Sequence, residues 1–237
     1  MVPECYPAAL SLLRERSPTA LAFVNLPFPQ NMPPKRKPAS TPVETETKIR
    51  VSSLKPVRKK IQAAGGRLLN ERTFESNTLF DSPGGSLRAS GQSFRVRRYG
   101  TEGSVTLKGM ARVEGGVKSR AELETQVSSP ETLAEILHAL GFEPQFRYEK
   151  FREVWQVGPT VVCLDETPLG PFVEIEGAAS AIFRIAKALE LDAADFLSAS
   201  YPALWSAAGR TDHMVFSEAA RGVKARASRT PRARETK

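Results

Sequence analysis

The chain has few of the residues that mark disulfide-rich, metal–sulfur or membrane proteins. Its 237 residues include two cysteines, Cys5 and Cys163, whose separation matches no metal or redox spacing. They imply no disulfide framework, which fits a reducing cytoplasm, and Cys163 is expected to be a buried, inert thiol. No apolar run approaches the roughly 18–20 residues that a membrane-spanning helix needs. We therefore expect a cytoplasmic protein without a membrane partner.

The centre of the chain also lacks net charge. Basic side chains exceed acidic ones by eight overall, but residues 43–209 hold 21 of each. The excess lies in the flanks: five basic and two acidic residues in 1–42, and eight basic and three acidic residues in 210–237. The high pI therefore says little about the central domain, and we expect no nucleic-acid partner beyond weak contact through the basic tail.

Composition divides the chain into three parts. Prolines crowd residues 1–42, which predicts a flexible leader, and a translation start at Met32 is a hypothesis that N-terminal mass measurement would test. Residues 43–209 carry regular apolar periodicity and are expected to form one domain. Residues 210–237 are rich in alanine and arginine, which predicts a disordered or partly helical basic tail.

The central part is rich in predicted strands. Alternation predicts strands near residues 43–51, 77–81, 92–98, 103–109, 119–127, 146–156, 160–166 and 172–177. Apolar stripes predict helices over 53–65, from Ser129-Pro130 to Gly141, and over 179–190, with shorter helical candidates at 192–197 and 201–208. Tight turns at 100–103 and 158–159, together with the strict alternation, favour a mostly antiparallel sheet.

Charged side chains recur with period two on these strands. Because successive side chains point to opposite faces, one face of the first strand presents Glu44, Glu46, Lys48 and Arg50. The same alternation returns as Arg95, Arg97, Lys108, Arg120, Glu122, Glu124, Lys150, Arg152, Asp165, Glu174 and Glu176. The opposite faces carry an expected core set of Phe94, Val96, Leu107, Leu123, Phe151, Leu164, Val173 and Ile175.

For a single strand, a charged face in water is the simplest explanation. The whole set favours another interpretation, because the acids come as Glu-x-Glu on three strands and the bases as Arg-x-Arg and Lys-x-Arg on two others. In a closed barrel these faces would line the interior. A dry interior would not hold so many charges, whereas a wet lumen could hold a divalent metal and a polyanion. A barrel with a merely solvated charged face remains the alternative.

At this point the sequence resembles a known family. Glu44-Thr-Glu-Thr-Lys48 matches the Glu-x-Glu-x-Lys signature of the CYTH, or triphosphate tunnel metalloenzyme, superfamily. The resemblance covers roughly residues 43–209 and continues through Phe94-Arg-Val-Arg97, Thr106-Leu-Lys108, Ser119–Glu124, Lys150-x-Arg152, Leu164-Asp165 and Leu169–Gly177. It implies an α+β fold, mainly antiparallel β: an eight-stranded closed barrel, or tunnel, with helices packed outside.

The resemblance also implies roles for individual residues. The expected triphosphate ligands are Lys48, Arg95, Arg97, Lys108, Lys150 and Arg152. The expected ligands of Mg²⁺ or Mn²⁺ are Glu44, Glu46, Asp165, Glu174 and Glu176, with Glu122 or Glu124 in addition. The residues expected to be catalytic are Glu44, Glu46, Lys48 and Arg97. Arg120 could bind phosphate or pair with an acid, and Tyr201 resembles a recurrent aromatic residue that packing explains equally well.

Members of the superfamily include class IV adenylate cyclases, thiamine triphosphatases, inorganic triphosphatases and RNA triphosphatases, and the spacing here is most similar to the bacterial class IV adenylate cyclase-like group. Metal-dependent hydrolysis of tripolyphosphate, thiamine triphosphate or ATP is the leading hypothesis. Cyclisation of ATP to cyclic AMP and pyrophosphate is the first alternative, and a non-catalytic polyphosphate- or nucleotide-binding module is the second. The sequence leaves open whether the chain is a monomer or a homodimer.

Overall fold

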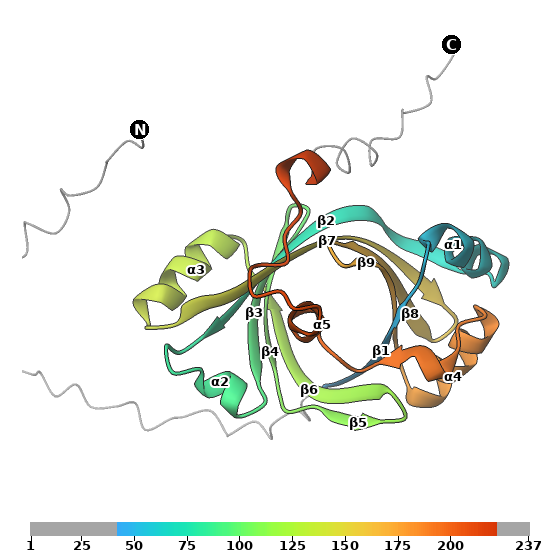
Figure 1. Cartoon of the computed structure of the whole chain (residues 1–237), viewed down its shortest axis with the longest axis horizontal. Helices are drawn as coiled ribbons and strands as arrows, with labels where there is room; N and C mark the ends of the chain where they lie inside the picture. The colour runs from blue at the N-terminus through green and yellow to red at the C-terminus, as the bar shows by residue number, and fades with distance from the viewer. Residues whose placement is uncertain (1–41, 222–237) are drawn as a thin grey trace, which may run out of the picture. The chain divides into compact units, whose positions relative to one another are not determined.

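The computed structural model describes residues 42–221, in which eight antiparallel strands close into a barrel (Figure 1). Going round the barrel, the order is β1-β9-β8-β7-β2-β3-β4-β6, and pairing of β6 with β1 closes the ring. The strands are β1 (Val43–Arg50), β2 (Arg67–Asp81), β3 (Ser93–Tyr99), β4 (Glu102–Lys108), β6 (Val117–Gln126), β7 (Glu143–Val157), β8 (Thr160–Thr167) and β9 (Gly170–Glu176). The predicted eight-stranded antiparallel barrel is confirmed.

Two short strands and one long strand differ from the sequence prediction. The strand β5 (Arg112–Glu114) extends the sheet beyond β6, and β10 (Phe196–Leu197) pairs with β1. The 192–197 segment was expected to be helical, but it forms only a 3₁₀ turn at Ala193–Asp195 before β10. β2 begins at Arg67 rather than near residue 77, because register shifts between Leu68 and Thr73 break the alternation that identifies a strand.

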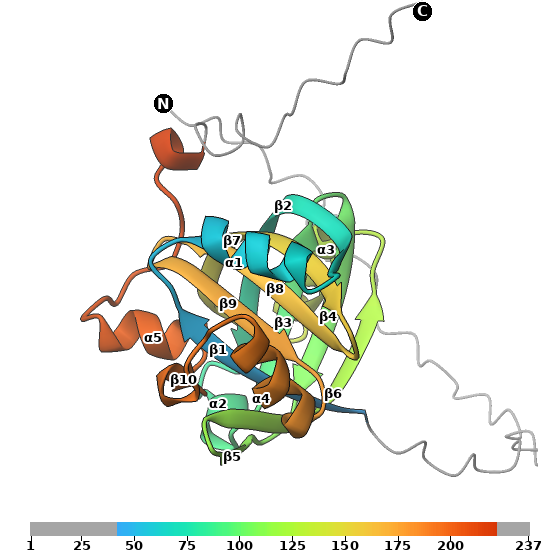
Figure 2. The ribbon, with the colours of Figure 1, turned by 90° about the vertical axis from the view of Figure 1, so that its right-hand side faces the viewer.

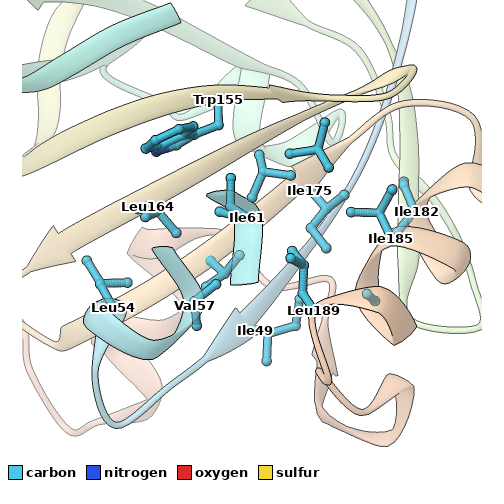
Figure 3. Close-up of a cluster of buried hydrophobic side chains, with 14 of the residues drawn as sticks. Ile49, Leu54, Val57, Ile61, Trp155, Leu164, Ile175, Ile182, Ile185 and Leu189 are labelled. Carbon is cyan, nitrogen blue, oxygen red and sulfur yellow. The ribbon is translucent and has the colours of Figure 1, made fainter. Parts of the chain in front are cut away.

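The largest apolar core lies outside the barrel wall, between β1, β7, β8 and β9 and two helices, α1 (Leu54–Ala63) and α4 (Ala179–Ala188) (Figure 3). Ser53 caps the start of α1, since its side chain accepts a hydrogen bond from the Lys55 N–H. Figure 2 shows both helices on the same side of the barrel. Because this core takes up the outward apolar side chains of the four strands, their alternate residues are left to face the lumen.

A smaller core lies on the outer face of β2 and β3, where Leu137 of α3 (Pro130–Ala139) packs with Phe80 and Val96. Leu123 of β6 was also expected in the core, but it is 56% exposed. The expectation is wrong because α1, α3 and α4 pack mainly on other strands of the barrel. Val117 at the start of β6 is still buried in the largest core, but the outward face of the strand is exposed at Leu123. The turn-like helix α2 (Ser86–Ala89) follows β2, and Asp81 accepts hydrogen bonds from its Leu87 and Arg88 N–H groups.

The helix α5 (Tyr201–Ala207) lies over one opening of the barrel in Figure 1 and beside one end of it in Figure 2. Beyond α5, Met214 exchanges backbone hydrogen bonds with Arg147 and Glu149 of β7. Ordered contacts therefore continue past residue 209, into the segment assigned from sequence to the tail. Residues 1–41 of the expected leader, with the proposed start at Met32, and residues 222–237 of the tail lie outside the described residues. No helix within residues 42–221 is long and apolar enough to cross a membrane.

Candidate active site in the barrel lumen

A cavity of about 740 Å³ runs through the lumen of the barrel. Its lining includes most of the charged residues that alternation placed on the inner face, contributed by β1, β3, β4, β6, β7 and β9: Glu44, Glu46, Lys48, Arg95, Arg97, Lys108, Arg120, Lys150, Arg152, Glu174 and Glu176. Acids and bases far apart in sequence therefore converge on one space. Three of the predicted site residues, Glu122, Glu124 and Asp165, are not part of this lining.

Three carboxylates form a compact group on one side of the cavity. Glu46 of β1 lies opposite Glu176 of β9 in the strand register, and Glu44 is two residues earlier in β1. One oxygen from each of the three lies within 4.8 Å of the others, close enough to hold a single metal ion. Like charges placed opposite each other repel. An all-oxygen donor set of this kind suits a hard cation such as Mg²⁺ or Mn²⁺, so these residues fit the expected metal.

The pKa values within the cluster reflect this crowding. Burial raises the pKa of Glu176 to about 7, although the Arg152 guanidinium opposes the change, and the nearby carboxylates add to it. Burial acts on Glu44 in the same direction, but the neighbouring Glu122 and the Lys108 ammonium outweigh it and lower the pKa of Glu44 to about 2. A cation placed among the three would favour the ionised form of all of them.

Two predicted metal ligands are instead engaged by bases. Asp165 is fully buried and accepts hydrogen bonds from Lys150 Nζ at 3.0 Å, from Arg152 Nε and Nη2 at 2.7 Å each, and from the Tyr201 hydroxyl at 2.7 Å. Glu174 pairs with Lys48 Nζ at 2.8 Å and with Arg152. Among the described residues, the three-carboxylate group does not include Asp165 or Glu174. Their visible contribution is to neutralise and fix the bases.

The Glu122 and Glu124 alternatives separate in the same way. Lys108 Nζ bridges Glu44 at 2.6 Å and Glu122 at 2.7 Å, so Glu122 lies next to the carboxylate cluster. Burial and the neighbouring Glu44 raise the pKa of Glu122 to about 7. Glu124 instead accepts a hydrogen bond from Thr106 at 2.5 Å and lies 3.5 Å from Arg95. Of the two, Glu122 is the one placed beside Glu44.

The cavity is also lined by buried donors that lack acceptors. The Nε atoms of Arg95, Arg97 and Arg120 are buried and have no hydrogen-bond partner among the described residues. Leaving a buried guanidinium N–H without an acceptor is costly, which favours an anion that brings oxygens with it. Lys48 also remains cationic, because the coulombic effect of Glu174 and Glu46 overcomes burial and raises its pKa.

Two charged residues that point into the barrel were not predicted from the sequence. Glu75 of β2 is fully buried and lies 3.5 Å from Lys150 and 3.9 Å from Arg97. Glu75 lies before residue 77, in a stretch that was not predicted to be a strand. Its inward orientation was therefore not predicted. Lys118 of β6 is buried and lies 2.6 Å from Glu46. The alternation through Arg120 and Glu122, extended two residues towards the N-terminus, would have found it.

Comparisons with known proteins agree with this architecture. A protein from Methanocaldococcus jannaschii named "Putative adenylate cyclase" is 25% identical over 149 residues, which cover 62% of this chain and 84% of that protein. A solved structure from Vibrio parahaemolyticus under the same description superposes with a TM-score of 0.60 at 22% identity, covering 69% of this chain and 97% of the other.

A third similar protein, from Hippeastrum, also bears an adenylyl cyclase name and is described as revealing a dominant triphosphatase activity. Its TM-score is 0.53 at 18% identity, with coverage of 70% of this chain and 96% of the other. At these identities the two solved structures support the fold. A family model described as CYTH domain matches residues 43–198, which is more than half of the chain. The chain therefore belongs to the CYTH domain family.

Proposed function

We propose that this protein is a divalent-metal-dependent enzyme that hydrolyses a phosphoanhydride bond of an inorganic or organic triphosphate inside the barrel. The observation that carries the proposal is that one cavity contains both a group of carboxylates suited to a metal ion and a set of basic residues suited to phosphate. Glu44, Glu46 and Glu176 meet within 4.8 Å on one side. The same lumen is lined by bases suited to phosphate: Lys48, Arg95, Arg97, Lys108, Lys150 and Arg152.

The bases would bind the phosphate chain and hold it in line for attack. Arginine offers a planar fork to phosphate oxygens, and the unpartnered Nε atoms of Arg95 and Arg97 are available donors. Fixed positive charge on the walls of the lumen would stabilise the negative charge that moves onto equatorial and leaving oxygens, which is usually the largest catalytic contribution. Glu75, Asp165 and Glu174 hold Lys150 and Arg152 in place before substrate arrives.

The carboxylate cluster would hold the cation. Glu44, Glu46 and Glu176 are the proposed ligands, and Glu122 lies beside them through Lys108. When bound there, Mg²⁺ or Mn²⁺ would supply Lewis acidity to phosphate oxygens and lower the pKa of a coordinated water. The contribution of the chain is to group these carboxylates beside the phosphate-binding bases.

Cyclisation of ATP is the second candidate function. It is supported by a part of the cavity lining that could contact the organic group of a nucleotide. Phe146, Trp205 and Arg88 line the same cavity as the charged residues, and they offer apolar and cationic surface that an organic group could contact. All three of the similar proteins described above carry adenylate or adenylyl cyclase names. The proposed metal and phosphate ligands would serve either reaction, so the fate of the reacting phosphorus decides between them.

One assay panel tests the proposal. The full chain is incubated with inorganic triphosphate, thiamine triphosphate or ATP, each with Mg²⁺ and with Mn²⁺, and the products are separated. Orthophosphate with a shortened phosphate chain supports hydrolysis, whereas 3′,5′-cyclic AMP with pyrophosphate supports the cyclase. Tight binding of a triphosphate without any metal-dependent product would replace both proposals with a binding module.

A further inference from the structure

The helix α5 reaches the lumen from outside the segment that the CYTH family model matches. The match ends at residue 198, and Tyr201 is the first residue of α5. Tyr201 is 4% exposed and lines the same cavity as the charged residues. None of the eight barrel strands contributes this side chain, so its contacts with lumen residues are an addition to the barrel.

The Tyr201 side chain contacts the lumen in two ways. The faces of its ring lie near two ammonium groups, with Lys48 Nζ 4.9 Å and Lys150 Nζ 5.1 Å from the ring centroid. Its hydroxyl donates a 2.7 Å hydrogen bond to Asp165 Oδ2, the same oxygen that Lys150 Nζ contacts at 3.0 Å. One aromatic side chain therefore touches two lysines and the acid that pairs with one of them.

We propose that Tyr201 is a positioning residue, which fixes the ammonium groups of Lys48 and Lys150 for phosphate binding; this inference rests on the proposed function. A lysine side chain is long and flexible, and its ammonium group acts as a point charge. An ion pair alone therefore fixes its position only loosely. An aromatic face attracts a cation through its quadrupole, more strongly when water is excluded. A ring shared by both lysines restricts them without adding a negative charge that would repel phosphate.

The position of the ring is itself fixed by surrounding contacts. It packs against the rings of Tyr148 and Phe172, at centroid distances of 6.0 and 5.5 Å. Further along α5, Trp205 Nε1 donates to the Asp212 carbonyl at 2.7 Å, and the buried Met214 belongs to the same apolar cluster. These contacts hold α5 against the barrel, so the ring presents a preformed surface to the two lysines.

Variants at two positions separate positioning from packing. Tyr201→Phe keeps the ring and loses the hydroxyl, whereas Tyr201→Leu removes both. Met214→Ala is the matched control, because it opens the same apolar cluster at a residue that does not line the cavity. For each variant, tripolyphosphate affinity is measured by titration calorimetry with Mg²⁺, KM and kcat are measured for turnover, and urea unfolding reports stability.

We expect Tyr201→Leu to weaken tripolyphosphate binding about tenfold, with a matching rise in KM and a smaller change in kcat. Tyr201→Phe should stay within about threefold of the wild type, because the ring faces both lysines. Met214→Ala should lower the urea midpoint at least as much as Tyr201→Leu while leaving the affinity unchanged.

Wild-type affinity in Tyr201→Leu, or an equal loss of affinity in Met214→Ala, overturns the positioning role while the proposed function stands. A wild-type protein that binds none of the triphosphates overturns both, because the two lysines would then have no phosphate to bind. The wild-type titration therefore tells the two failures apart.

Discussion

The acidic residues of the lumen form two groups that have the same alternating pattern in the sequence. The clustered carboxylates, Glu44, Glu46 and Glu176, bring their oxygens within 4.8 Å of one another. The paired carboxylates, Glu75, Asp165 and Glu174, are each buried among at least two bases. Both groups come from inward positions of alternating strands. They differ in what the neighbouring strands place beside them.

This difference separates acids that stabilise the fold by pairing with bases from acids that are proposed to bind a metal ion. The bases around the paired carboxylates lower the pKa of Glu174 well below its usual range, in spite of burial. In the clustered group, burial with like charges nearby raises the pKa of Glu176 to about 7. Every paired acid lies beside at least two bases. In the clustered group Glu44 pairs with Lys108 and Glu46 with Lys118, but Glu176 lies 4.0 Å from Arg152, so the negative charge there is only partly compensated. This partly compensated charge is where a cation would be stabilised most.

The largest expected effect is on a paired carboxylate. Asp165→Asn keeps the shape of the side chain but removes the charge facing Lys150 and Arg152. Removing one partner of a buried ion pair leaves the other uncompensated, so the free energy of unfolding should fall by about 3–5 kcal/mol. Urea unfolding measures the change, with Glu114→Gln on the exposed strand β5 as the control. A loss no greater than that of the control would mean that Asp165 does not stabilise the lumen.

The next effect concerns a clustered carboxylate and should appear in activity instead. Glu44→Gln removes one proposed metal ligand and relieves repulsion within the cluster, which offsets part of the lost pairing with Lys108. Turnover should fall by at least about 100-fold, the upper range for residues that merely support metal ligands. Metal-dependent product formation and urea unfolding are measured on the same sample. Wild-type turnover of tripolyphosphate in this variant would remove Glu44 from the site.

The smallest of the three effects is a pH dependence that belongs to the paired group. Burial alone would raise the pKa of Glu75, but Lys150 and Arg97 outweigh it and lower the pKa below its ordinary value of 4.5. The stability that Glu75 provides is therefore present above pH 4.5 and is lost as the pH falls towards the lowered value.

Glu75→Gln should flatten this part of the profile. Between about pH 5 and pH 3, the variant should lose about 1–2 kcal/mol less unfolding free energy than the wild type, because one carboxylate fewer must be protonated. Thermal or urea unfolding across this range gives the comparison, and Glu114→Gln should follow the wild-type curve. Parallel curves for Glu75→Gln and the wild type would show that Glu75 is not held ionised by its neighbours.

Much of the barrel could be predicted because alternation is a local property. The eight predicted strands correspond to the eight strands of the barrel, and Glu46, Lys48, Arg95 and Lys150 face the lumen as their period required. The prediction was incomplete where the outcome depends on how strands pair and pack, which the local alternation does not reveal. Register shifts between Leu68 and Thr73 interrupt the alternation of β2 just before Glu75. Leu123 follows the apolar pattern at a position of β6 that is left exposed.

The sequence by itself determined which side chains point inward, because the pleat of a strand fixes the face of every second residue. Only the tertiary structure decided which inward acid meets another acid and which meets a base. That choice depends on register between strands far apart in the chain, such as β1 with β9, and on a helix that enters from beyond the barrel. Electrostatic energies change steeply over a few ångströms, so the same residue type becomes a proposed metal ligand in one place and a fixed counter-charge in the other.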